Sequence, residues 1–120
     1  MSWTVFLVVG AAVGVLLILK KSGQISARDA AAHLQNGALV IDVRSPDEFQ
    51  SGHLRQALNL PLDDLAASAP GRLKDKNQVL LLHCLSGMRS GMAQRKLQAL
   101  GYANVFNLGS LARARQICGG

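Results

Sequence analysis

The chain contains 120 residues, 49% of them hydrophobic, and its 13 basic and 7 acidic residues give a net charge of +6. We expect these 120 residues to hold one globular domain at most. Because the basic residues are scattered and only 4% of the residues are aromatic, we do not expect nucleic-acid binding, which needs clustered charge and stacking side chains. The two cysteines and three histidines lack the spacing of a zinc site, so we expect no metal and no other cofactor.

The N-terminal segment differs in composition from the rest of the chain. Residues 3–19 carry no charge, and their length is at the short end of what spans a bilayer as a helix. We therefore predict a transmembrane anchor in residues 1–21, with its helix at about residues 3–19, and a globular domain in residues 22–120. A cleaved signal peptide fits less well, because no basic residue precedes the apolar segment and Lys20 and Lys21 follow it. A buried core helix would need a larger domain around it.

The charges that flank the apolar segment predict its orientation. Lys20, Lys21 and Arg28 all lie on the C-terminal side, so the positive-inside rule predicts a single-pass protein with its N-terminus outside and its domain in the cytoplasm. Gly10 and Gly14 form a small-xxx-small pattern that suits a homodimer of membrane helices, although glycine is common in such helices anyway. In the cytoplasm, we do not expect a structural disulfide.

After the anchor, nearly continuous apolar segments alternate with segments that have helical features. Ser26 and Ser45 each precede an acidic residue by three positions, which is typical of a helix start, and Pro46 suits the first helical position. The alternation predicts an α/β fold, a parallel sheet flanked by helices on both faces, preceded by the transmembrane helix. The expected elements are strands at residues 24–25, 38–43, 57–59, 79–82 and 104–107, and helices at residues 27–35, 45–52, 63–67 (closed by Pro70 and Gly71), 90–100 and after residues 109–110.

Cys84 is the candidate nucleophile. It lies between the strand expected at residues 79–82 and the helix expected at residues 90–100. Backbone amides of such a turn and the helix dipole favour an anion, and the thiolate is the reactive form of cysteine. In parallel sheets, ligands bind beyond the carboxyl ends of the strands, where Cys84 is expected. The helix after it is expected to bury Met92, Ala93, Leu97 and Leu100 and to point Gln94 elsewhere.

Three segments resemble the rhodanese family of sulfurtransferases. Residues 41–49 (IDVRSPDEF) are similar to the family's D-V-R-x-x-x-E-(F/Y) segment, and residues 52–61 (GHLRQALNLP) to its G-H-I-x-x-A-x-N-(I/L)-P segment. Residues 84–90 (CLSGMRS) resemble its C-x-x-G-x-R-S active loop. The resemblance covers about residues 24–111. It implies a single rhodanese-like domain in which Cys84 takes a sulfane sulfur from thiosulfate or a protein persulfide and passes it to cyanide, a thiol or an acceptor protein.

The loop itself carries further predictions. Amides of Leu85, Ser86, Gly87, Met88, Arg89 and Ser90 are expected to surround the terminal sulfur of a Cys84 persulfide. Four residues separate Cys84 from Arg89, whereas cysteine-dependent phosphatases have five and a wider cradle, so sulfur is favoured over phosphate. Because Leu85, Ser86 and Met88 bring no charge, we hypothesise that the donor is a persulfide rather than thiosulfate.

Residues around the loop have open alternatives. Arg89 either holds an anionic donor or orders the loop, and Ser90 is expected to cap the helix rather than to act in catalysis. A general-base role for His83 competes with the alternation of a strand, which turns its side chain away from Cys84. Asp42 either orients loop amides or Arg89, or forms a cap or an ion pair. Arg44 and Glu48 are expected to pair, and His53 and Asn59 to hold the connection between helix and strand.

The C-terminus departs from the family pattern N-(L/V)-x-G-G-x-x-x-W. Residues 107–110 keep part of it, but Arg113 or Ala114 stands where the tryptophan is expected, which leaves the packing of the last helix open. Cys118 is either a tail residue or a second thiol that relays sulfur. Two functional alternatives remain: a non-catalytic module that carries persulfide or recruits a partner to the membrane, and a small phosphatase or arsenate reductase.

Overall fold

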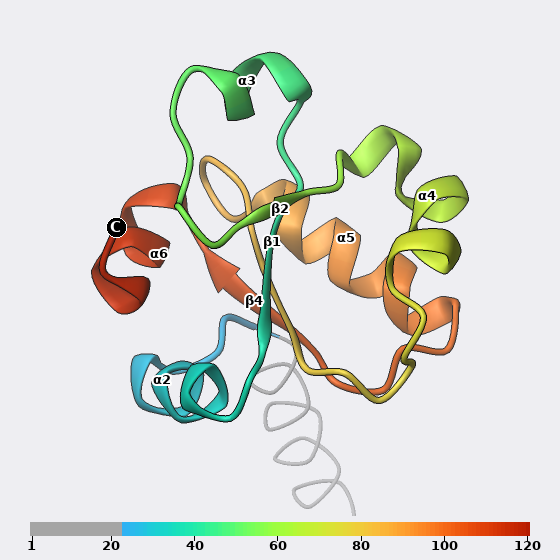
Figure 1. The fold of residues 1–120 in the computed structure, drawn as a ribbon, viewed down its shortest axis with the longest axis horizontal. Coiled ribbons are helices and arrows are strands. Elements are labelled where there is room, and N and C mark those ends of the chain that lie inside the picture. Colours follow the sequence, from blue (N-terminus) through green and yellow to red (C-terminus); the bar gives the residue numbers. More distant parts are fainter. Residues whose placement is uncertain (1–22) are drawn as a thin grey trace, which may run out of the picture.

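The computed structural model describes residues 23–120 (Figure 1). The predicted anchor, its orientation and the pairing through Gly10 and Gly14 lie outside these residues. Within residues 23–120, no helix has the length and apolar character needed to cross a membrane. In chain order the elements are α2 (Ala27–Gln35), β1 (Leu39–Asp42), α3 (Pro46–Gln50), β2 (Leu58–Asn59), the 3-10 turn η1 (Leu62–Asp64), α4 (Leu65–Arg72), β3 (Leu80–His83), α5 (Met88–Ala99), β4 (Val105–Gly109) and α6 (Leu111–Cys118).

The strands form one parallel sheet in the order β2-β1-β3-β4. Asp42 at the end of β1 aligns with His83 at the end of β3, so the carboxyl ends of the two central strands meet at one edge. Gln24 adds a single parallel bridge to Asn107 of β4, where a brief edge strand was predicted. The α/β fold predicted for the globular domain is confirmed.

Each face of the sheet is covered by its own helices. The helices α4 and α5 pack on one face, and α2 and α6 pack on the other (Figure 1). Successive residues of β3 point to opposite faces, so Leu80 and Leu82 join one hydrophobic cluster and Leu81 joins the other. All three are fully buried, and burial of each leucine side chain contributes roughly 2–3 kcal/mol. Cys84 belongs to the α4–α5 cluster, whereas Cys118 packs against the α2–α6 cluster.

The helix starts predicted at Ser26 and Ser45 are confirmed. The Ser26 hydroxyl accepts a hydrogen bond from the amide of Asp29 at 3.1 Å. Ser45 and Glu48 form a reciprocal capping box at the start of α3. Because caps depend on residues three positions apart, local sequence was sufficient to place both starts.

The predicted end of the α4 helix is wrong. Pro70 lies inside α4, which continues to Arg72. The proline removes one helical hydrogen bond, but Leu65 and Ala69 on the same helix are fully buried, and the Tyr102 hydroxyl lies within hydrogen-bond distance of the carbonyls of Ala69 and Leu73. Packing from a distant part of the chain therefore outweighs the loss.

The buried face of α5 also differs from the prediction. Ser90, Ala93, Gln94 and Leu97 are its buried residues, whereas Met92 is 46% exposed. Gln94 was expected to point elsewhere, but its amide donates to the carbonyl of Val105 at 3.0 Å. That hydrogen bond compensates the burial of a polar group, which the apolar pattern alone does not anticipate.

The last helix is anchored without the family tryptophan. Ser110 caps α6 by accepting from the amide of Arg113 at 3.1 Å, and Ala114 is fully buried. The Arg113 guanidinium donates to the carbonyls of Leu108 and Ile25, which ties α6 to β4 and to the N-terminal segment. A surface hollow of about 350 Å³ remains between α2 and α6, lined by Ala27, Ala31, Arg113, Gln116 and Ile117.

Candidate active site

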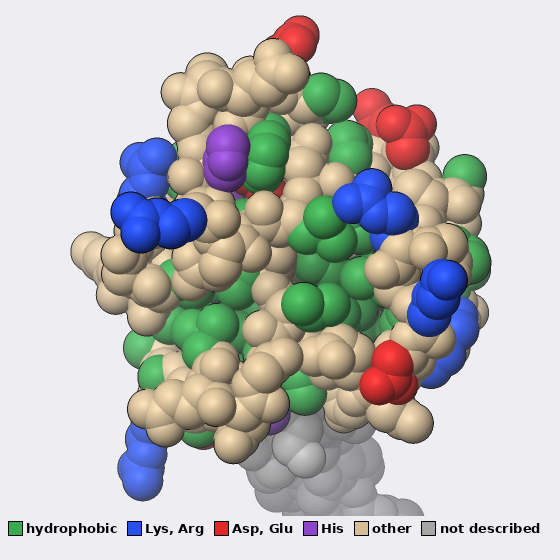
Figure 2. Space-filling model, viewed as in Figure 1, with side chains coloured by type: hydrophobic (Ala, Val, Ile, Leu, Met, Phe, Trp, Pro, Cys, Tyr) green, Lys and Arg blue, Asp and Glu red, His purple; other side chains and the backbone are tan. Residues whose placement is uncertain are grey.

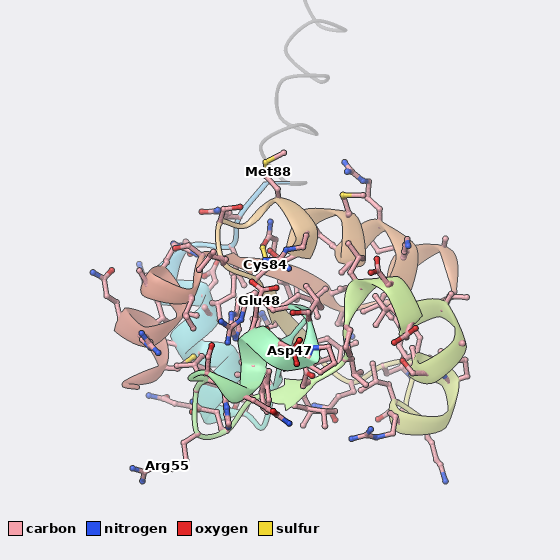
Figure 3. All side chains as sticks on the ribbon, turned by 90° about the horizontal axis from the view of Figure 1, so that it is seen from above. Asp47, Glu48, Arg55, Cys84 and Met88 are labelled. Carbon is pink, nitrogen blue, oxygen red and sulfur yellow. The ribbon has the colours of Figure 1, made fainter. Side chains whose placement is uncertain are left out.

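Cys84 lies directly after β3, at the carboxyl edge of the sheet, and its side chain is buried (Figure 3). The chain then turns at Gly87, which has a φ of +99° and is the N-cap residue of α5. Only glycine adopts this backbone region readily. As a result the Gly87 amide points back at the cysteine and donates to its Sγ at 2.9 Å. The loop is thus folded around the sulfur atom, as predicted for an anion-binding turn.

The surroundings of Cys84 favour its thiolate. Burial by itself raises the pKa of a thiol, but hydrogen bonds from the Ser90 amide and hydroxyl and from the Gly87 and Ser86 amides lower the pKa of Cys84 below its ordinary value. The amides of the first turn of α5 also bring the positive end of the helix dipole to the sulfur. The thiolate of Cys84 is therefore stabilised here.

Ser90 is not the helix cap that was predicted. The helix α5 begins at Met88, with Gly87 in the capping position, so Ser90 lies in the first turn and is fully buried. Its hydroxyl lies 2.7 Å from Asn107 Oδ1, 3.1 Å from the Gly87 carbonyl and 3.6 Å from Cys84 Sγ. The earlier helix start converts a predicted capping residue into one that contacts the sulfur.

Asn107 holds the loop from the neighbouring strand β4, a role that sequence analysis missed. Its Nδ2 donates to the Gly87 carbonyl at 3.1 Å, and its Oδ1 accepts from the Ser90 hydroxyl and from the Gly109 amide at 3.0 Å. One buried side chain therefore holds the middle and the C-terminal end of the loop at residues 84–90 against β4. Two signals could have indicated it: a polar residue within an apolar strand, and its match to the asparagine of the family's C-terminal segment.

Arg89 forms an ion pair with Glu48, so the predicted pair of Arg44 and Glu48 is wrong. The guanidinium nitrogens of Arg89 lie 2.6 and 2.9 Å from the two carboxylate oxygens of Glu48. The hydrogen bond with Arg89 lowers the pKa of Glu48 from 4.5 to about 2, and the same bond raises the pKa of Arg89. This bidentate pair links α3 to the loop across 41 residues of sequence.

Arg44 pairs instead with Asp42, in the interior of the domain. The Arg44 Nη2 lies 2.8 Å from Asp42 Oδ2 and donates to the Gly52 carbonyl at 2.7 Å. The ion-pair alternative for Asp42 is therefore correct, and the hydrogen bonds of its carboxylate go to Arg44 rather than to Arg89 or the loop. Asp42 is the last residue of β1 and Arg44 lies two positions after it, so the buried carboxylate has a compensating charge close by.

His83 lies beside this buried pair. Its Nε2 is 3.8 Å from Asp42 Oδ2 and has no hydrogen-bond partner among the described residues. Burial lowers the pKa of His83, and the Asp42 charge only partly opposes that shift. Its Nδ1 lies 3.4 Å from the Cys84 carbonyl rather than at the sulfur. Burial therefore favours the neutral ring, and its nitrogens lie toward the Cys84 carbonyl and Asp42 rather than toward the sulfur.

His53 and Asn59 hold the connection between α3 and β2, as predicted. His53 Nδ1 lies 2.7 Å from the Phe49 carbonyl, and its ring stacks on Phe49 with centroids 3.7 Å apart. Asn59 Nδ2 donates to the carbonyls of Asp42 and Arg44, each at 3.0 Å. These contacts fix the segment that carries Glu48 and, through it, Arg89.

The surface around the buried sulfur is apolar on one side and acidic on another. Leu85 and Met88 are 56% and 78% exposed. Beside Arg89 a cavity of about 120 Å³ opens, and its lining includes the carboxylates of Asp63 and Asp64. The full lining is Val43, Ser45, Pro46, Pro61, Leu62, Asp63, Asp64 and Arg89.

The fold and site together define an α/β domain whose parallel sheet carries, at its carboxyl edge, a cysteine in a loop that favours the thiolate. A family comparison specifies the class further. The model of the rhodanese-like domain matches residues 26–112, so the chain belongs to the rhodanese-like domain family.

Individual relatives agree with this assignment. The thiosulfate sulfurtransferase PspE of Escherichia coli K12 is 37% identical over 71 residues, covering 59% of this chain and 68% of the relative. A sulfurtransferase of Allochromatium vinosum is 37% identical over 79 residues, covering 64% and 72%. A solved structure described as rhodanese with anions from E. coli is 34% identical, with a TM-score of 0.61 over 64% of this chain and 91% of that chain. Several other relatives are longer, and the chain spans less than two thirds of their length. The names of the sulfurtransferase relatives support this activity at the level of the family.

Proposed function

We propose that this protein is a membrane-anchored sulfurtransferase that carries sulfur as a persulfide on Cys84. The observation that supports it most directly is the convergence of loop amides on a thiol whose pKa is lowered despite its burial. Membership in the rhodanese-like family supports the same chemistry. The proposed chemistry needs no metal and no organic cofactor.

The reaction consists of two displacements at sulfur. The Cys84 thiolate attacks the outer sulfur of the donor, the sulfur–sulfur bond of the donor breaks, and the donor leaves with that electron pair, as sulfite from thiosulfate or as a thiolate from a persulfide. An acceptor thiolate or cyanide then attacks the outer sulfur of the Cys84 persulfide and releases the Cys84 thiolate. Amides of Gly87 and Ser90, which already donate to the resting sulfur, are suited to the terminal sulfur of the intermediate.

A persulfide is a better candidate for the donor than thiosulfate. Arg89 is the one cation of the loop, and its charge is already paired with Glu48. The adjacent cavity presents Asp63 and Asp64, which repel a small dianion. Steady-state turnover by the full chain should therefore be higher with a persulfide donor than with thiosulfate. Much lower turnover with the persulfide would refute this donor assignment and leave the sulfurtransferase proposal intact.

The membrane part of the proposal is supported by sequence alone. Residues 3–19 are uncharged and positive charges follow them, so residues 1–21 are proposed to anchor the chain with its N-terminus outside and the catalytic domain in the cytoplasm. The proposed partners are a sulfur donor, which includes a protein persulfide, and a thiol acceptor, with a homodimer through Gly10 and Gly14 as a further proposal. Nucleic acid is not a proposed partner, and on the face seen in Figure 2 most Lys and Arg side chains lie toward the left and right edges, with hydrophobic side chains between them.

Intact-protein mass spectrometry of the full chain in detergent tests the chemistry. After incubation with thiosulfate or a persulfide donor, the wild-type protein should gain the mass of one sulfur atom, and cyanide should remove it. The Cys84→Ser variant should gain nothing, whereas Cys118→Ser should behave as the wild type does. Failure of the wild type to take up sulfur from either donor would overturn the proposal.

A non-catalytic persulfide carrier is the second candidate, and the complete burial of the Cys84 side chain favours it, because a covered sulfur exchanges slowly with free substrates. Turnover distinguishes the two functions. An enzyme produces many equivalents of product per chain, whereas a carrier loads one sulfur and releases it only to a cognate partner.

A further inference from the structure

We propose that the cysteine loop faces the lipid bilayer, so that an apolar rim formed by Leu85, Met88 and Met92 rests in the headgroup layer. The inference rests on the membrane anchor of the proposed function and goes beyond it, because it specifies which face of the domain meets the membrane. It is argued from the exposure of the rim and from the place where the chain enters the domain.

The rim is an unusual surface for this domain. Leu85, Met88 and Met92 are 56%, 78% and 46% exposed, and they account for three of the four large exposed hydrophobic residues in residues 23–120. The fourth, Leu39, lies at the start of β1, away from the carboxyl edge. All three rim residues lie in the loop or the first two turns of α5. Clustered exposed apolar side chains mark a surface that meets another apolar phase or molecule, and methionine adapts well to irregular contacts.

The chain enters the domain beside this rim. Gln24 bridges to Asn107, and the adjacent Ile25 amide donates to the Asn107 carbonyl at 2.9 Å, which fixes the entry point on the sheet. The Gln24 side chain covers Gly87: a Cβ on that glycine would lie 2.9 Å from Gln24 Nε2. Met88 is the next residue, and Figure 3 shows it on the opposite side of the domain from Arg55.

The connection between the anchor and the domain is too short for the face that carries Gln24 to turn away from the membrane. Five peptide steps separate Leu19, the last residue of the predicted helix, from Gln24, and an extended chain covers at most about 3.6 Å per residue, or about 18 Å in total. Lys20 and Lys21 in this connection are attracted to anionic headgroups, which shortens the separation further. The face that carries Gln24 and Gly87 is therefore the face next to the membrane.

This orientation defines a class of substrate. The buried sulfur of Cys84 lies next to the rim. If the rim rests among the headgroups, a substrate reaches this sulfur from the bilayer surface. A sulfur donor or acceptor that is lipid-soluble or tethered to the membrane reaches it by diffusion in two dimensions. The uncharged side chains of Leu85 and Met88 suit such a molecule better than a dianion from bulk water.

Tryptophan quenching in vesicles tests the orientation. The chain has one tryptophan, Trp3, so Trp3→Phe gives a background in which Met88→Trp or Arg55→Trp is the only tryptophan. Each variant is reconstituted as the full chain in phosphatidylcholine and phosphatidylglycerol vesicles with acyl chains brominated near the headgroup. Met88→Trp should be quenched roughly twofold or more relative to unbrominated lipid, with a blue-shifted emission, and Arg55→Trp should not be quenched.

The other outcomes overturn the proposal in separable ways. If Trp3 of the wild type is quenched but Met88→Trp is not, the anchor is inserted and the rim faces elsewhere. A blue-shifted Met88→Trp emission without quenching indicates a protein contact at the rim instead of lipid. Equal quenching of Met88→Trp and Arg55→Trp means that the domain has no preferred face. If Trp3 itself is not quenched, the proposed anchor fails and the rim proposal fails with it.

Discussion

The two cysteines of this chain are both largely withdrawn from water, yet their pKa values move in opposite directions. Burial raises the pKa of Cys118, which packs at the edge of the α2–α6 cluster. Burial acts in the same direction on Cys84, but hydrogen bonds from Ser90, Gly87 and Ser86 reverse it. Burial alone therefore makes a thiol inert, and a set of donors aimed at the sulfur makes it reactive.

The largest difference between the two cysteines is expected in sulfur-transfer turnover when each one is replaced by serine. Cys84→Ser should abolish sulfur-transfer turnover, because no other described thiol has its pKa lowered. Cys118→Ser should leave turnover within about twofold of the wild type, since surface or edge substitutions of this kind usually change little. Turnover of the full chain with a persulfide donor measures both. A large loss in Cys118→Ser would support the sulfur relay through Cys118 instead.

The pH dependence of alkylation should separate the two thiols next. Iodoacetamide reacts with the thiolate, so each rate rises with pH and reaches a plateau above the pKa. Normalised to its own plateau, Cys84 should be half-maximal below the ordinary thiol pKa and Cys118 above it. Peptide mass spectrometry reads both sites in one sample, with Cys118 as the internal reference. Coincident midpoints would show that the donors around Cys84 do not favour its thiolate.

Asn107→Ala should raise the pKa of the Cys84 thiol, toward the behaviour of Cys118. The substitution removes the acceptor of the Gly109 amide and one hydrogen bond each from the Gly87 carbonyl and the Ser90 hydroxyl, at a cost of about 1–3 kcal/mol. The Cys84 alkylation midpoint should rise, the Cys118 midpoint should not move, and turnover should fall by roughly tenfold as the loop loosens. Asn104→Ala is the matched control, because the Asn104 side chain bonds to the exposed turn at Asn77. An unchanged Cys84 midpoint in folded Asn107→Ala would remove the positioning role.

Glu48→Gln should give the smallest effect. The folded-state pKa of Glu48 is lowered to about 2 from 4.5, so the ion pair stabilises the fold above pH 4.5 and loses this contribution as the pH falls toward 2. Because Arg89 and Glu48 are 37% and 32% exposed, solvent screening limits the contribution to roughly 1 kcal/mol or less. Denaturant unfolding at several pH values should show wild type and Glu48→Gln converging below pH 4.5. A difference that persists at pH 2 would contradict the assignment.

Some predictions near the site failed because the ion pairs and hydrogen bonds join residues that the sequence pattern does not connect. Arg44 and Glu48 are four residues apart, which made them natural partners in sequence, but the turn after β1 places Arg44 on Asp42 and leaves Glu48 for Arg89. The clamp of Asn107 on Gly87 and Ser90 spans 17 to 20 residues, and no periodicity reveals it. The predictions for Gln94 and Pro70 failed for a related reason. The hydrogen bond that compensates the burial of Gln94 comes from Val105, and the contacts that hold α4 together around Pro70 come from Tyr102.

The sequence by itself determined the parallel α/β fold, the helix caps at Ser26 and Ser45, and the place of Cys84 at the carboxyl edge of the sheet. These features depend on interactions within a few residues and on the side-chain period of each element. Only the tertiary structure decided which charges pair, that Ser90 and Asn107 hold the cysteine loop, and that Gln24 lies against it. Such contacts arise where strand ends and loops from distant parts of the chain meet, so they follow from the packing of the sheet rather than from spacing along the chain.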